Sequence, residues 1–63
     1  MTRDEWIKRY VARMLACGSL QTEQQLIASA ELGCDATEAM GRLNPDDWED
    51  PEAIADEHLE NEQ

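Results

Sequence analysis

A regular repeat of apolar residues begins at Trp6 and strongly favours a helical fold. Thr2 and Glu5 have the spacing of a capping box, with Thr2 as the N-cap and Glu5 at the third helical position. Apolar residues then recur three and four positions apart, while cations take the opposite face. We expect an amphipathic helix that ends at Gly18 in a left-handed cap. The repeat consists of Trp6, Ile7, Tyr10, Val11, Met14 and Leu15.

Two shorter helices are expected to follow. Thr22 and Gln25 have the spacing of a second capping box, and Gly33 is expected to stop the helix that they open. Asp35 is the expected N-cap of the next helix. That helix should be short or frayed, because Gly41 costs about 1 kcal/mol relative to Ala in a helix interior.

Two Asx-Pro pairs divide the last third of the chain. Asn44-Pro45 should end the preceding helix and can open a new turn, since a residue before Pro avoids the α region and Pro suits the first helical position. Leu43 and Trp48 are spaced as a hydrophobic staple around this turn. Asp50-Pro51 repeats the pair and opens a helix that should run to about Leu59. No alternating run of β-branched residues predicts a strand.

These signals predict a single all-α domain over residues 1–60, a small bundle of three to four short helices, with a disordered tail over 61–63. A chain of 63 residues builds only a marginal core and often gains stability from a metal, disulfides or a second copy. We expect a homodimer. The first helix supplies the candidate core or dimer seam through Trp6, Ile7, Tyr10, Val11 and Met14.

The charge of the chain is unevenly distributed. The net charge is −10, yet residues 1–13 carry four cations against two acids, and Arg42 is the only cation after them. Such an excess of negative charge repels phosphates and disfavours direct nucleic-acid binding, whereas it favours a basic protein surface as partner. The alternative is that the acids only keep a small protein soluble.

Nine of the acids crowd into residues 44–63, around Trp48. Carboxylates spaced over a helical surface can imitate the phosphates of a duplex and occupy a basic groove. Trp is common at interface hot spots, although Trp48 can instead complete the core by packing on Leu43. The candidate partner-binding residues are Asp46, Asp47, Trp48, Glu49, Asp50, Glu52, Asp56 and Glu57.

The sequence offers few groups for catalysis or metal binding. His58 is the only histidine, and Cys17 and Cys34 form no metal-binding motif. We therefore expect no enzyme activity, no catalytic or metal site and no cofactor. No signal-peptide segment and no apolar run of about 18 residues occurs, so we expect a cytoplasmic protein with reduced thiols and no membrane contact.

Two stretches, Thr2–Met14 and Trp48–Leu59, resemble small acidic helical proteins encoded by phages and prophages of proteobacteria. The first matches an opening of the type Asp-Glu-Trp with a basic amphipathic helix, and the second a closing acidic segment with Trp. The resemblance implies a host-takeover or counter-defence protein that binds and blocks one host protein, as anti-CRISPR inhibitors do.

A second resemblance is to ubiquitin-associated three-helix domains. Leu32-Gly33-Cys34-Asp35 is similar to the loop of that family, although Cys34 replaces an aromatic residue. This resemblance implies a compact helix-turn-helix core and carries no expectation of ubiquitin binding. The residues that match the two following helices are Ala39, Leu43, Ala55 and Leu59.

The leading hypothesis is a phage-type protein that inhibits a host protein, such as a nucleic-acid-binding defence complex, through its acidic surface. The alternative is a structural or regulatory adaptor that binds a partner through the apolar face of the first helix, with the acids only solubilising the chain.

Overall fold

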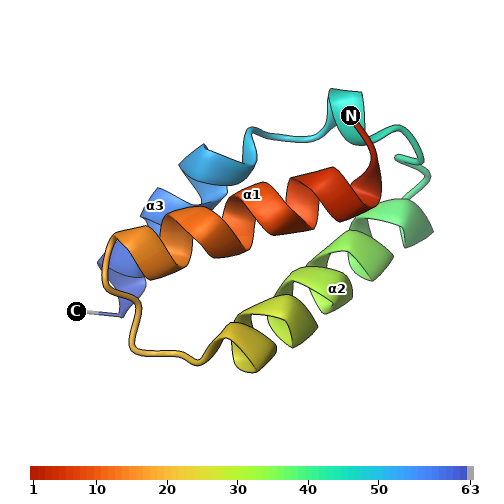
Figure 1. Cartoon of the computed structure of the whole chain (residues 1–63). Helices are drawn as coiled ribbons and strands as arrows, with labels where there is room; N and C mark the ends of the chain where they lie inside the picture. Colours follow the sequence, from red (N-terminus) through yellow and green to blue (C-terminus); the bar gives the residue numbers. More distant parts are fainter. Residues whose placement is uncertain (63) are drawn as a thin grey trace.

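The computed structural model describes residues 1–62 and contains helices but no strand in that part of the chain (Figure 1). The predicted all-α fold is therefore confirmed. Within these 62 residues, three α-helices are joined by two connections, the second of which includes one short 3₁₀ helix. The elements are α1 (Arg3–Ala16), α2 (Glu23–Ala39), η1 (Pro45–Asp47) and α3 (Pro51–Asn61).

Helix α1 begins after the predicted N-cap Thr2 and ends before the predicted left-handed Gly18. The Thr2 hydroxyl oxygen accepts a hydrogen bond of 3.1 Å from the backbone N–H of Glu5, which satisfies one of the free donors of the first turn. At the other end Gly18 has φ +81°, a left-handed conformation in which glycine carries no Cβ penalty. The Ser19 N–H then donates to the Met14 carbonyl at 2.9 Å and closes the cap.

Helix α2 starts at the predicted capping box of Thr22 and Gln25 but does not stop at Gly33. The predicted third helix from Asp35 is wrong, and so is the loop that the ubiquitin-associated resemblance implies for Leu32–Asp35, because both segments lie inside α2. Glycine weakens a helix interior by only about 1 kcal/mol, which burial of one face of α2 offsets. The helix ends instead near Gly41, where φ is +94°.

The predicted Asx-Pro cap is present at Asn44, whereas Asp50 precedes α3 as expected but makes no side-chain capping hydrogen bond. The Asn44 side chain accepts a hydrogen bond of 3.1 Å from the Asp46 N–H, with Pro45 at the start of η1. Pro51 occupies the first turn of α3, which continues past the expected end at Leu59 to Asn61. Beyond it, within the predicted tail 61–63, the Glu62 carboxylate accepts hydrogen bonds from the α1–α2 loop, and Gln63 lies outside the described residues.

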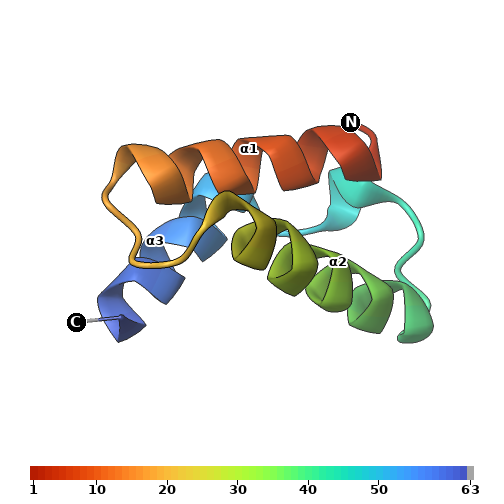
Figure 2. The ribbon, with the colours of Figure 1, turned by 60° about the horizontal axis from the view of Figure 1, so that its bottom comes forward.

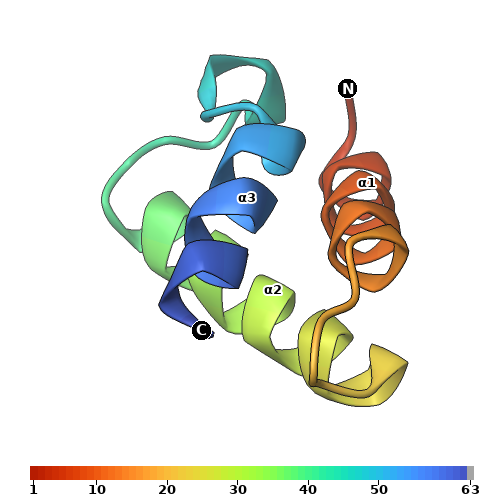
Figure 3. The same cartoon turned by 90° about the vertical axis from the view of Figure 1, so that its left-hand side faces the viewer.

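The helices form two layers, with α1 over α2 and α3 (Figures 2 and 3). Helices α1 and α3 run in the same direction along the molecule, and α2 returns in the opposite one (Figure 1). Helix α1 packs against both of the others. It is therefore the central element of the fold.

Most of the apolar face of α1 is buried inside one chain, although Leu15 at its end is 44% exposed. Trp6, Ile7, Tyr10, Val11 and Met14 are all buried, with Met14 completely so. They pack with Leu26, Ala30 and Cys34 of α2 and with Ala55 of α3. These α1 residues form the core of the monomer, so the face assigned to a dimer seam or an adaptor contact has its partners within the same chain.

Candidate functional site

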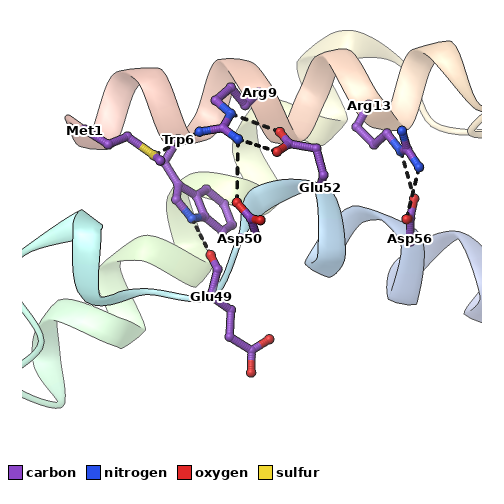
Figure 4. Close-up of polar contacts among 8 residues, drawn as sticks. All are labelled: Met1, Trp6, Arg9, Arg13, Glu49, Asp50, Glu52 and Asp56. Carbon is purple, nitrogen blue, oxygen red and sulfur yellow. Dashed lines mark hydrogen bonds and ion pairs between the residues drawn. The ribbon is translucent and has the colours of Figure 1, made fainter.

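The acidic C-terminal stretch folds back onto the basic side of α1 (Figure 4). Arg9 forms a two-pronged ion pair with Glu52 and a weaker one of 3.5 Å with Asp50. One turn further along, the Arg13 guanidinium donates to both oxygens of Asp56 at 2.9 and 3.1 Å. The pairs form a ladder because α1 and α3 run in the same direction and each carries its charges four residues apart.

The N-terminus extends this ladder to the 3₁₀ helix. The Met1 ammonium group lies 2.6 Å from the Asp46 carboxylate, and this hydrogen bond raises the pKa of the ammonium group above its usual value. Four of the predicted partner-binding carboxylates are thus engaged by cations of their own chain. They are Asp46, Asp50, Glu52 and Asp56.

The ion pairs between α1 and α3 orient the two helices but add little to the free energy of unfolding. Arg13 holds the pKa of Asp56 below its usual range through their hydrogen bonds. Both side chains are about half exposed, and exposed ion pairs contribute only about 0–1 kcal/mol. These ion pairs hold the cations of α1 against acids of the same chain, and they fix the position of α3 against α1.

A groove with a volume of about 440 Å³ lies between α2 and α3. Its floor is formed by Trp6 and Tyr10 of α1, and α3 contributes Ile54 to its wall. Such a mixture of aromatic and aliphatic lining is typical of sites that take an apolar group of a ligand or partner. The side of α2 that lines the groove carries Ser29, Ala30, Gly33, Cys34, Thr37 and Met40.

Trp48 closes one end of this groove and joins it to the core. Its ring meets Trp6 edge-on with centroids 6.0 Å apart, and its indole N–H donates to the Arg42 carbonyl at 3.0 Å. The predicted staple with Leu43 is wrong, because Leu43 is 72% exposed and Trp48 packs on Trp6 instead. Trp48 is partly buried, so the two roles considered for it are compatible.

Tyr10 and His58 meet at the floor of the groove. The Tyr10 hydroxyl lies 2.7 Å from His58 Nδ1, a hydrogen bond that links α1 to α3, and the two rings meet edge-on. Burial raises the pKa of Tyr10 above its usual value, so the phenol keeps its proton at neutral pH. Sequence reasoning did not find this pair, since nothing local relates positions so far apart in the chain.

Two of the predicted acids stand at the rim of the groove. Glu49 and Glu57 line it, and no cation within residues 1–62 forms an ion pair with either carboxylate. The Glu49 side chain points away from α1, while its carbonyl accepts a hydrogen bond of 2.9 Å from the Trp6 indole (Figure 4). Asp47 is exposed on η1. Among the residues that the structure describes, Arg42 is the one Lys or Arg side chain that lines the groove.

Seven of the eight predicted residues separate into two sets, and the eighth, Asp47, belongs to neither. Asp46, Asp50, Glu52 and Asp56 tie the chain to itself, whereas Trp48, Glu49 and Glu57 meet at the groove. Among the residues described, no group of three or more potential ligands could hold a metal ion, and no helix is long and apolar enough to cross a membrane. Comparison with protein families, with curated proteins and with solved structures finds no match to this chain.

Proposed function

We propose that this protein acts by binding a basic segment of a partner protein in the groove between α2 and α3. The observation that carries the proposal is the combination of an aromatic floor, Trp6 and Tyr10, with two rim carboxylates, Glu49 and Glu57, that have no cation of their own in the described chain. An apolar side chain flanked by Lys or Arg fits both features. The aromatic floor supplies contact area, and the carboxylates supply orientation.

The charge balance of the whole molecule supports a basic partner. The net charge is −10, and three of the five Lys and Arg side chains, together with the N-terminus, are occupied by ion pairs within the chain. The remaining field is strongly negative, and it steers cationic surfaces toward the molecule while it repels nucleic-acid phosphates. Association with a basic protein is therefore expected to be fast and to weaken with salt.

The partner class that we propose is a nucleic-acid-binding protein of a bacterial host, which this chain would inhibit as phage-encoded counter-defence proteins do. The resemblance of Thr2–Met14 and Trp48–Leu59 to such proteins supports this class. Imitation of a duplex by all the acids of residues 44–63 receives less support, since four of those carboxylates are neutralised by cations of the same chain. We therefore propose a contact that is limited to the groove and its two rim carboxylates.

A comparison of two variants with equal charge tests the proposal. Glu49→Gln with Glu57→Gln removes both rim charges, whereas Glu5→Gln with Glu31→Gln removes two exposed charges that do not line the groove. The tagged wild type is expected to retain a basic protein from a proteobacterial lysate, and duplex DNA should compete for it. The rim variant should lose that protein and the control should keep it. Equal loss from both variants would show that overall charge, rather than the groove, does the binding.

A further inference from the structure

Helix α2 is apolar on two faces, and only one of them is covered. Leu26, Ala30 and Cys34 are buried in the core. On the outer side lie exposed residues at spacings of four and three, so that they share one face. These residues, here called the outer face of α2, are Ala28, Leu32, Ala36, Ala39 and Met40.

The outer face carries no charge in a chain in which 32% of residues are charged. Two of the acids of α2, Asp35 and Glu38, are drawn toward α1 by Arg3, which lies 2.8 Å from Asp35 and 2.5 Å from Glu38. Leu32 and Met40 of this face remain 70% and 74% exposed. An uncharged apolar strip on so acidic a surface is an unusual feature for a chain that acts alone.

We propose that the outer face of α2 is the contact between two copies of this chain, which pair in an antiparallel, two-fold symmetric arrangement. Two molecules that each carry a net charge of −10 repel one another wherever acids meet, so a second copy can approach only at an uncharged surface. The outer face is such a surface. This interface borders the groove, which opens on the neighbouring side of α2 and shares Met40 and Arg42 with it, and the inference goes beyond the proposed function.

The sequence of α2 favours a two-fold axis at Leu32. Antiparallel pairing about this point places Leu32 against Leu32 of the partner subunit and Ala28 against Ala36 of the partner subunit. Alanines on both sides of the central leucine allow the helix backbones to approach closely. The two leucines at the axis then fill the centre of the contact, as the apolar core of a small interface requires.

The same register matches the two ends of α2. Leu20, just before the helix, and Leu43, just after it, are 84% and 72% exposed, and the pairing sets Leu20 close to Leu43 of the partner subunit. It also brings Arg42, which has no ion pair among residues 1–62, to the end of the partner helix that bears Glu23. Four of the five large hydrophobic side chains that the monomer exposes would thereby be covered.

The contact involves only one helix and its two flanking turns. We therefore expect it to bury a smaller area than the roughly 800 Å² per partner of a standard interface. A dissociation constant on the order of micromolar is therefore expected. Salt should strengthen the dimer, because it screens the repulsion between the acidic chains without weakening an apolar contact. This response is opposite to the one expected for a basic partner in the groove.

Sedimentation equilibrium across the micromolar range tests the proposal. The wild type should pass from one to two chains as its concentration rises. Leu32→Glu places two like charges at the axis and should remain monomeric, whereas Leu15→Glu, on the exposed side of α1, should dimerise as the wild type does. Circular dichroism must show unchanged helix content in both variants. A wild type that stays monomeric up to hundreds of micromolar, or a dimer that survives Leu32→Glu, would overturn the proposal.

Discussion

Replacing Gly33 with Ala should stabilise this protein, and the sign of the effect tests whether α2 is continuous. Gly33 lies inside α2 with a helical backbone, and a Cβ built at this position would meet nothing within 4 Å. The alanine would therefore cause no clash. It would also restrict the unfolded chain, which glycine leaves with more conformational freedom.

The expected gain is about 0.5–1 kcal/mol, the usual difference between Gly and Ala in an exposed helix interior. For a domain of 60–100 residues, 1 kcal/mol corresponds to a shift in Tm of about 4–8 °C. The Gly33→Ala variant should thus melt about 2–8 °C above the wild type when followed by circular dichroism at 222 nm. The protein should be dilute enough for Tm to be independent of concentration, so that self-association does not contribute.

Gly41→Ala is the matched control. Gly41 has φ +94°, and Gly18 has φ +81°, so an alanine at either position is forced into the left-handed region at a cost of about 1–2 kcal/mol. Both variants should melt below the wild type. If Gly33→Ala also lowered Tm by several degrees, then Gly33 would be acting as a left-handed helix end, and the continuous α2 described above would be refuted.

Three further effects follow from the core and the α1–α3 contacts. Met14→Ala should lower the free energy of unfolding by about 2–5 kcal/mol in urea titrations, because Met14 is fully buried; a loss below about 1 kcal/mol would contradict its central place. Tyr10→Phe should cost about 0.5–1.5 kcal/mol through the lost hydrogen bond to His58, measured in the same way, and an unchanged midpoint would count against that bond. Arg13 lowers the pKa of Asp56, so the carboxylate contributes stability that is present above its unfolded pKa of about 3.9 and is lost as the pH falls through the folded value. The wild type should therefore melt above Asp56→Asn near neutral pH, and this difference in Tm should disappear below about pH 4. A difference in Tm that grew on acidification would contradict a lowered pKa of Asp56.

The helix beginnings could be predicted from sequence because the signals are local. The side chains of Thr2, Thr22 and Asn44 each bond a backbone N–H two or three residues ahead, whatever the rest of the chain does. The end of α2 could not be predicted in this way. Gly33 and Gly41 both look like possible stops, and packing of the helix on α1 decides between them.

The kinds of residue at the candidate site could be predicted from the sequence, but their partners in the fold could not. The sequence places many acids around Trp48, but the arginines that pair with Glu52 and Asp56 lie more than forty residues earlier, on α1. These residues come together only when the chain folds. One signal was available. Arg9 and Arg13 are four residues apart, as are Glu52 and Asp56, which is the spacing that two helices running in the same direction would match. No comparable spacing in the sequence indicates the hydrogen bond between Tyr10 and His58.

The most direct test of the proposed function is an NMR titration of the ¹⁵N-labelled protein with a short amphipathic peptide of Arg and Leu. Binding in the groove should shift the indole N–H signals of Trp6 and Trp48 and the backbone signals around Glu57. Affinity should fall in Glu49→Gln with Glu57→Gln and persist in Glu5→Gln with Glu31→Gln. Shifts spread over all the exposed acids, with equal loss in both double variants, would contradict a specific site and leave only general attraction between opposite charges.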